Sequence, residues 1–288
     1  MRSIASRNGK IKVKRSDRVI PGFGLSLGIT IVMLSVLILI PLASVLLYSF
    51  QLSPDKFVTL ITNRAVLFAF GTSISCAFIA ALINCIFGTV LAWVLVRYDF
   101  PGKRILDGVV ELPFCLPTAV AGITLSKLYS DTGWMGRIFS RIGVKISYTH
   151  IGLTIALIFI GIPFVVRAIQ PVLENLDPQL EEAAYALGAN SRITFFKIIL
   201  SELRPALLTG FALAFARGIG EYGSVIYISG NSAKDHTQVI SYVIMQKLNY
   251  MDYASATAIA LVLLIISFSI LFLINVIQIR QSKRTNYL

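Results

Sequence analysis

The sequence has few charged residues and little capacity for metal or disulfide chemistry. Charged residues make up 14% of the 288-residue chain, against roughly 25% in an average soluble domain. In contrast, 56% of the residues are hydrophobic and the mean hydropathy is +0.78. One soluble core of this length cannot bury so much apolar surface, so the expected solvent is a lipid bilayer. The composition therefore argues against a soluble enzyme, a disordered chain and a secreted disulfide scaffold.

Motifs for metal binding and catalysis are also missing. The three cysteines, Cys76, Cys85 and Cys115, lie in apolar stretches without a Cys-x-x-Cys pair, and only two histidines are present. We therefore expect no metal site and interpret the cysteines as buried free thiols. The sequence lacks Gly-x-x-x-x-Gly-Lys-[Ser/Thr], the loop that cradles nucleotide phosphates, and a Gly-x-Ser-x-Gly nucleophile motif. We expect no catalytic residues and no cofactor bound by this chain.

Long apolar runs account for the hydrophobic excess and predict an all-α polytopic membrane protein. About 20 apolar residues suffice to cross a bilayer. The six expected spans are residues 23–50, 65–96, 108–129, 146–166, 205–228 and 253–279. Pro41 is expected to kink the first span, and Pro113 and Pro117 to make the first turns of the third irregular. A seventh span stays open if the amphipathic stretch 193–200 enters the membrane.

The basic residues predict the topology. The chain has 26 Lys and Arg against 14 Asp and Glu, a net charge of +12. With both termini on one side of the membrane, most of the basic residues fall on that side, which the positive-inside rule assigns to the cytoplasm. The predicted organisation is a basic cytoplasmic segment 1–18, a transmembrane domain 19–279 and a cytoplasmic tail 280–288. We therefore expect contact with lipid and none with nucleic acid.

The cytoplasmic loop 167–204 carries a helix–turn–helix pattern. Asp177 followed by Pro178 is typical of a helix start. The acidic residues 181–182 then fall in the first turns of this helix, where the helix dipole favours negative charge. Gly188 is a typical helix terminator, after which Asn190 or Ser191 is expected to cap a second helix. From the residues alone, docking into a groove on a partner and a solvated connector are equally open.

The spacing in this loop matches a known signature. Glu182-Ala183-Ala184, then Gly188 after three residues and Ile198-Ile199-Leu200 after nine more, resembles the EAA motif of ABC importer permeases. The family signature ends in Leu-Pro, whereas Ser201 stands at the proline position here, which leaves the exit of the second helix open. The resemblance implies that segment 177–204 couples to a separate ATPase subunit that binds the ATP. The implied coupling residues are Glu181, Glu182, Ala183, Ala184, Gly188, Ile198 and Leu200.

The resemblance covers roughly residues 19–280. Segments PGFGLSLG, LPFCLPTAVAG, GIPFVVRAIQPVLENL and RGIGEYGSVIYISGN resemble the T subunits of bacterial and plastid sulfate/thiosulfate permeases. The resemblance implies the type I ABC importer permease fold and an ATP-driven import of sulfate or thiosulfate. It also implies an ATPase dimer, a second, W-type permease subunit and a periplasmic binding protein as partners. The membrane is a bacterial inner membrane or, alternatively, a plastid inner envelope. Molybdate or tungstate stays open as the cargo, although segment 117–120 favours sulfate.

Charges, prolines and hydroxyls inside the expected spans mark the candidate pathway. Arg217 and Glu221 are four residues apart and are expected to pair on one helix face, either as a gate or as a structural ion pair. Glu111 lies either on the pathway or at the cytoplasmic interface, paired with Lys103 or Arg104. The pathway candidates are Glu111, Pro113, Pro117, Thr118, Arg217, Gly220, Glu221, Gly223 and Ser224, with Ser126 as a further hydroxyl.

An ion-coupled secondary transporter is the second class of function considered. It would use Glu111 or Glu221 as a proton relay, and such carriers often contain two repeated halves. We find no internal repeat in the sequence.

Overall fold

The computed structural model describes residues 23–285, and all regular structure within that range is helical. The chain separates into two compact units, which meet between Leu47 and Tyr48 and are described one at a time. Within the described residues, five helices are long and apolar enough to span a membrane, or six if one sharply bent pair counts as a single span. The all-α fold and the six spans are therefore confirmed.

The N-terminal unit consists of one helical segment. It comprises α1 (Phe23–Leu34), the π-helical turn η1 (Ser35–Leu39) and α2 (Ile40–Ser49), whose last residues belong to the second unit. Pro41 has no N–H to donate to the carbonyl of Leu37. The helical turn just before Pro41 is wider than an α-helical turn, because the N–H of Ile40 donates to the carbonyl of Ser35, five residues earlier. The irregularity expected at Pro41 thus takes the form of a π-helical turn. Residues 1–18, the predicted basic segment, lie outside the described residues.

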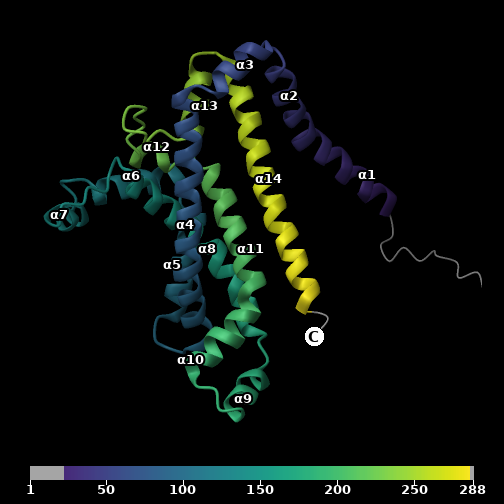
Figure 1. The fold of residues 1–288 in the computed structure, drawn as a ribbon, viewed down its shortest axis with the longest axis vertical. Coiled ribbons are helices and arrows are strands. Elements are labelled where there is room, and N and C mark those ends of the chain that lie inside the picture. Colours follow the sequence, from purple (N-terminus) through teal and green to yellow (C-terminus); the bar gives the residue numbers. More distant parts are fainter. Residues whose placement is uncertain (1–22, 286–288) are drawn as a thin grey trace, which may run out of the picture. The chain divides into compact units, whose positions relative to one another are not determined.

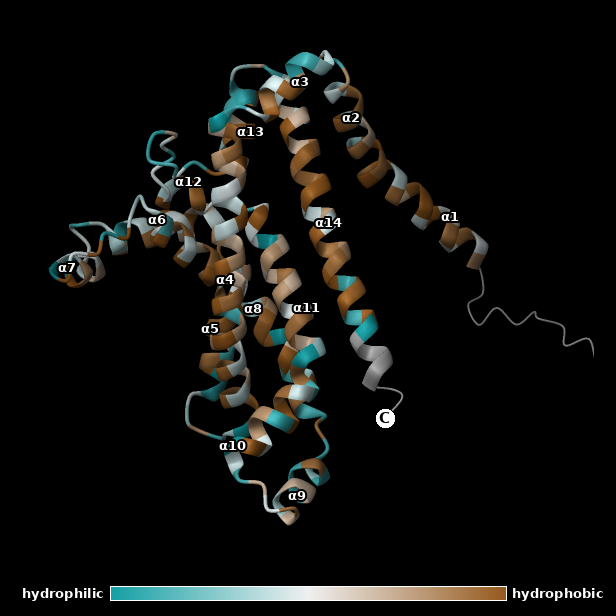
Figure 2. Cartoon of the chain, in the orientation of Figure 1, coloured by the Kyte–Doolittle hydropathy of each residue, from teal (hydrophilic) through white to brown (hydrophobic). Residues whose placement is uncertain are grey.

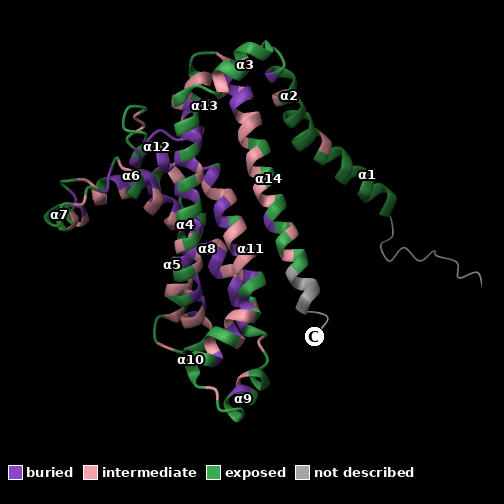
Figure 3. Ribbon diagram, viewed as in Figure 1, coloured by how far each residue is buried: buried purple, intermediate pink, exposed green. Residues whose placement is uncertain are grey.

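Three long helices form the centre of the second unit (Figure 1). They are α4 (Arg64–Arg97), α8 (His150–Glu174) and α11 (Leu200–Ile219), and each pair of them is in extensive contact. The long helix α14 (Tyr253–Thr285) packs on α11 and on the shorter α13 (Ile240–Asn249). Figure 2 shows apolar residues along most of each long helix, and Figure 3 shows that buried positions concentrate on α4, α8 and α11. Apolar positions left exposed on these helices fit contact with lipid.

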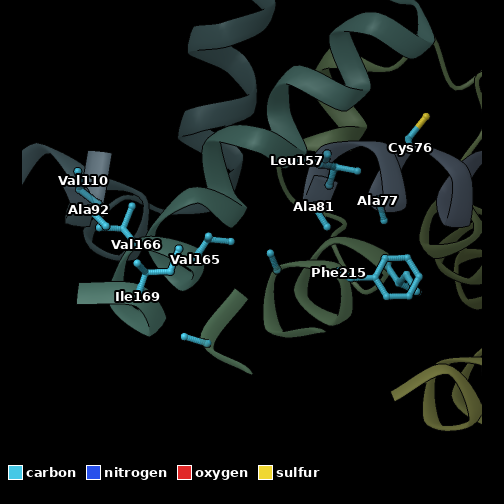
Figure 4. Close-up of a cluster of buried hydrophobic side chains, with 14 of the residues drawn as sticks. Cys76, Ala77, Ala81, Ala92, Val110, Leu157, Val165, Val166, Ile169 and Phe215 are labelled. Atoms are coloured by element: carbon cyan, nitrogen blue, oxygen red, sulfur yellow. The ribbon is translucent and has the colours of Figure 1, made fainter. Parts of the chain in front are cut away.

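The central helices approach closely because small residues lie at their contacts. A Cβ on Gly88 of α4 would come within 2.8 Å of a Val165 methyl group, and one on Gly210 of α11 within 2.9 Å of the Val165 Cα. Buried aliphatic and aromatic residues fill the remaining space around these contacts, including Leu157, Ile169 and Phe215 (Figure 4). Close packing of this kind is the main source of helix association in lipid.

The third expected span is broken in its middle. It consists of α5 (Lys103–Cys115) and α6 (Thr118–Tyr129), which meet at an angle of 110°. The expectation of irregular first turns was wrong. Pro113 lies inside the regular helix α5, and the break falls at Leu116 and Pro117. The residue before a proline avoids the helical region, and Leu116 accordingly has a ψ of 133°.

The fifth expected span starts earlier and ends earlier than the sequence predicted. A short α10 (Ser191–Ile193), the π-helical η2 (Thr194–Ile199) and α11 form one continuous 29-residue helix, Ser191–Ile219. The helix continues through Ser201, which stands at the position of the signature proline, and through Pro205. The second helix of the loop therefore has no exit at this point. The stretch 193–200 is the beginning of this span rather than a seventh one. Beyond residue 219 the chain is irregular up to the single turn α12 (Val225–Ile228).

The connecting segments contain further helices. They are α3 (Pro54–Ile61), α7 (Trp134–Arg141) and α9 (Pro178–Ala186). Cys115 is exposed on α5, so the expectation of a buried thiol was wrong for this residue, whereas Cys76 is buried and Cys85 is half-buried.

The close approach of α8 and α11 predicts unequal effects of two glycine substitutions. Gly210→Ala places a methyl group against the backbone of Val165, and we expect the overpacking to cost about 1–3 kcal/mol. Gly71→Ala is the matched control, because a Cβ on Gly71 meets nothing within 4 Å. We expect Gly210→Ala alone to lower the apparent melting temperature of the purified protein in detergent. Equal melting temperatures for the two variants would contradict the packing described for Gly210.

Candidate functional site

The EAA-like loop follows the C-terminal end of α8, and α9 extends beyond the ends of the long helices (Figure 1). Its first helix, α9, begins as the sequence predicts, since a side-chain oxygen of Asp177 accepts a hydrogen bond from the Gln179 N–H at 2.9 Å. Asn190, one of the two predicted caps of the second helix, accepts from the Ile193 N–H at 2.9 Å. Both short helices are therefore specified locally by their caps.

Gly188 ends α9 in a left-handed conformation. Its φ is +82°, and the N–H groups of Gly188 and Ala189 donate to the carbonyls of Tyr185 and Ala184 at 2.9 and 3.0 Å. These two bonds form a Schellman motif, which favours glycine at this position. A Cβ on Gly188 would meet nothing within 4 Å. The requirement for glycine is thus one of backbone conformation and not of space.

An ion pair and two aromatic contacts join α9 to the bundle. Arg97, the last residue of α4, donates a hydrogen bond to the carboxylate of Glu181. The same guanidinium lies 5.1 Å from the centre of the Trp93 ring, a cation–π contact. Trp93 in turn meets the Phe195 ring of η2 edge to face, with centroids 5.3 Å apart. Glu181 is thereby connected both to α4 and to the long helix that begins at Ser191.

The loop also presents apolar side chains to its surroundings. Leu187 is 89% exposed, and Leu180 and Tyr185 on α9 are also exposed. The predicted coupling residues have different surroundings: Glu182, Ala183 and Gly188 are exposed, Ala184 is buried, and Glu181, Ile198 and Leu200 are half-buried. A patch of large exposed apolar residues beside charged groups is typical of a protein–protein contact site.

Glu111 does not pair with Lys103 or Arg104, as one alternative expected. Its carboxylate accepts a hydrogen bond from Arg167 of α8 at 2.6 Å. The same guanidinium donates to Asp107 at 2.9 Å and to the side-chain oxygen of Gln170 at 2.6 Å. Arg167, which the sequence assigns to the cytoplasmic loop, instead lies within α8. It connects α5 to α8 through two carboxylates, while Lys103 pairs with Asp99 at 2.9 Å.

Arg217 and Glu221 do pair, at 2.5 Å, but not on one helix face, because α11 ends at Ile219 and Glu221 follows it. The Glu221 side chain is 2% exposed, and its other oxygen accepts from the Ser224 N–H at 2.8 Å. The carbonyl of Glu221 accepts from the Ser241 hydroxyl of α13 at 2.7 Å. Glu221 therefore satisfies polar groups on three consecutive elements around the break that follows α11.

The irregular segment 220–224 packs against the first turns of α6. A Cβ on Gly223 would come within 2.1 Å of the Thr118 hydroxyl oxygen, and one on Gly122 within 2.3 Å of the Ser224 carbonyl. The structure thus gathers Thr118, Gly223 and Ser224 beside the Arg217–Glu221 pair, with Gly220 exposed at the helix end. Glu111 belongs to the separate cluster around Arg167. Pro113 is buried in α5, and Pro117 is exposed at the bend.

Several residues at these sites were missed by the sequence analysis. Arg97, Trp93 and Phe195 anchor the loop, and Asp107 completes the Arg167 cluster. The signal that would have found Asp107 is its spacing of four residues from Glu111, which puts two acids on one face of a helix. Among residues 23–285, no group of three or more His, Cys, Asp or Glu is placed to hold a metal ion.

The described residues thus form a bundle of membrane-spanning helices in which one span is broken, with a capped helical loop at one end, as in polytopic helical membrane proteins. More specifically, residues 84–287 match the family described as "Binding-protein-dependent transport system inner membrane component". The chain belongs to this family.

Relatives of similar length extend the match. The sulfate transport system permease protein CysT of Salmonella typhimurium is 45% identical over 269 residues, which cover 93% of this chain and 97% of the relative. The Escherichia coli protein of the same name gives the same identity and coverage. A Marchantia polymorpha protein described as "Probable sulfate transport system permease protein cysT" is 52% identical over 215 residues, or 74% of each chain.

Solved structures agree on the fold. A chain of a bacterial alginate ABC transporter, in complex with its alginate pentasaccharide-bound periplasmic protein, superposes with a TM-score of 0.75 at 19% identity over 90% of this chain and 94% of that one. A chain of the MetNI methionine ABC transporter in an inward-facing conformation gives 0.59 at 15% identity, over 80% of this chain and 99% of that one. These likenesses confirm the predicted ABC importer permease fold.

The anchor of α9 predicts the result of a charge reversal. Arg97→Glu should increase the mobility of a spin label at Leu187→Cys, in a chain with Cys115→Ala, because Glu181 then faces a like charge. Combining Arg97→Glu with Glu181→Arg should reduce the mobility again. The side chains are 29% and 21% exposed, so we expect a contribution of about 1 kcal/mol or less. Lys103→Glu, which changes a different pair, is the control. Mobility equal to that of the parent chain in the Arg97→Glu variant would contradict the anchoring role.

Proposed function

We propose that this chain is one permease half of an ATP-driven importer that carries sulfate or thiosulfate into the cell. The observation that carries the proposal is the 45% identity to sulfate permeases across 93% of the chain. A periplasmic binding protein selects the anion, and a second permease subunit of the W type completes the pathway. A dimer of ATPase subunits, separate from this chain, binds and hydrolyses ATP. The membrane is the bacterial inner membrane, with both termini in the cytoplasm.

The coupling route follows from the contacts of the loop. An ATPase subunit docks on α9 and its exposed residues Leu180, Tyr185 and Leu187. Motion of α9 passes through Glu181 and Arg97 to α4, and through the Trp93–Phe195 contact to the helix Ser191–Ile219. That helix is about 43 Å long at 1.5 Å per residue. It carries the displacement to the break at 220–224, where Arg217, Glu221 and Thr118 border the translocation pathway.

A transport assay tests the substrate. A bacterial strain that lacks its own sulfate importer should regain uptake of labelled sulfate when this chain is expressed with its transporter partners. Excess unlabelled thiosulfate should reduce the uptake strongly and molybdate only weakly. Uptake should require ATP and persist after the proton gradient is collapsed. Strong competition by molybdate alone would favour the molybdate alternative, and loss of uptake with the proton gradient would favour a secondary transporter.

The left-handed backbone of Gly188 tests the coupling role. Gly188→Val forces a β-branched residue into a conformation that costs roughly 1–2 kcal/mol even for an ordinary side chain. We therefore expect reduced binding of the ATPase subunit and at least a fivefold loss of uptake. Gly188→Asn is the matched variant, since asparagine tolerates this conformation, and it should keep most of the activity. Normal ATPase binding and uptake in Gly188→Val would contradict coupling through this turn.

A further inference from the structure

A polar cavity lies beside the N-terminal end of α8, whereas the EAA-like loop follows the C-terminal end of the same helix. It has a volume of about 410 Å³ and lies between the C-terminal turn of α6, the turn that follows it, Tyr148 and Tyr227 of α12. Tyr148 is two residues before the first residue of α8, whereas α9 follows the last turn of the same helix. With the loop in the cytoplasm, this cavity faces the outside. Figure 1 shows α6 and α12 side by side here.

The cavity combines one positive charge with several hydroxyl groups. Lys127 supplies the ammonium, and the hydroxyl-bearing residues around it are Ser126, Ser130, Thr132, Tyr148 and Tyr227. The ammonium donates one long hydrogen bond, 3.4 Å to the Thr132 hydroxyl. It forms no ion pair with any carboxylate in the described part of the chain. Since an ammonium has three N–H donors, most of its hydrogen-bonding capacity is free for a ligand.

The charge of the lining side chains distinguishes this cavity from two other polar cavities. A cavity near the C-terminal end of α8 is lined by basic residues and also by Asp99, Asp107 and Glu174. A second cavity, beside α3, is lined by Asp55 as well as Lys56. Carboxylates would repel an anion and attract a cation. The cavity at Lys127 has no carboxylate in its lining. Its chemistry therefore fits an anion with several oxygen acceptors.

The backbone at Tyr148 is held in a strained conformation that places this residue on the cavity wall. Its φ is +65°, in the left-handed region that a bulky residue rarely adopts. Its N–H donates to the carbonyl of Ile228 at 2.8 Å, next to Tyr227. The neighbouring Ser147 donates its hydroxyl to the carbonyl of Ser126 at 3.0 Å. Backbone strain fixed by such contacts is concentrated at functional sites, and here two tyrosines are brought to one cavity.

We propose that this cavity is an outer binding site for a tetrahedral oxyanion, with Lys127 as its charged ligand and the other lining hydroxyls as neutral donors. Ser130 is excluded as a donor because its hydroxyl already donates to the Lys127 carbonyl at 2.8 Å. The proposal rests on the proposed function for the identity of the oxyanion as sulfate, which enters here after release from the binding protein. A single ammonium with neutral donors binds a dianion weakly enough to release it inward. A lipid phosphate has the same chemistry, so the test separates the two sources.

Transport kinetics in proteoliposomes of the assembled transporter provide the first arm. Lys127→Met should lower the maximal rate of sulfate uptake at least fivefold, with the half-saturating concentration of loaded binding protein unchanged. Lys127→Arg should restore part of the rate because it keeps the charge. Lys145→Met, in the same outer segment but outside the cavity lining, is the matched control and should behave like the parent. An unchanged maximal rate, or a change only in the half-saturating concentration, would overturn the proposal.

Thiol labelling provides a second arm that does not require transport. Ser130→Cys, in a chain whose exposed Cys115 is replaced by Ala, should react from the outside with a membrane-impermeant maleimide. Excess sulfate should slow the reaction at least threefold, whereas chloride at equal ionic strength should not. Protection that depends on the phospholipid present and not on sulfate would assign the site to a headgroup and overturn the proposal, as would no protection. Failure of the parent transporter to import sulfate, with protection intact, would instead contradict the proposed function alone.

Discussion

The structure depends on how closely α4, α8 and α11 can approach one another. Lipid tails are as apolar as the side chains, so moving a side chain from lipid to a neighbouring helix lowers the free energy only slightly. Helix association in a membrane therefore relies on packing contacts between the helices. Gly88 of α4 and Gly210 of α11 both face Val165 of α8, at distances that leave no space for a further methyl group. Because this frame is tightly packed, the less regular elements can be supported by it without forming continuous spans of their own.

The break between α5 and α6 and the irregular segment 220–224, which follows α11, stabilise each other. Non-helical backbone is tolerated at membrane depth only where protein or an aqueous cavity surrounds it. The start of α6 packs against segment 220–224, with Gly122 and Gly223 allowing contact at the backbone. Glu221 accepts the hydrogen bond of the Ser224 N–H, which has no helical partner, and is itself neutralised by Arg217. As a result, two segments more than 90 residues apart in the sequence are packed against each other.

The sequence predicted the spans and the local geometry of the loop more accurately than the contacts between elements. Apolar runs and the capping residues Asp177, Asn190 and Gly188 act over a few residues, so their effects can be inferred from the chain itself. The break at Leu116 was displaced from the expected position because the helix accommodates Pro113. The partner of Glu111 could not be predicted, since Arg167 is 56 residues away and only the packing of α5 on α8 brings the two together. The roles of these residues in transport remain predictions.

The distribution of ion pairs also explains how an anion can pass through a chain of net charge +12. A dianion would be retained by several unpaired guanidinium groups, because a fixed charge away from bulk water interacts strongly. Within the spans, Arg167 is paired with two carboxylates and Arg217 with the buried Glu221. Their positive charge is therefore largely cancelled and serves to hold helices together. Lys127 has no such partner among the described residues, and this contrast with the two arginines is the basis of the binding site proposed above.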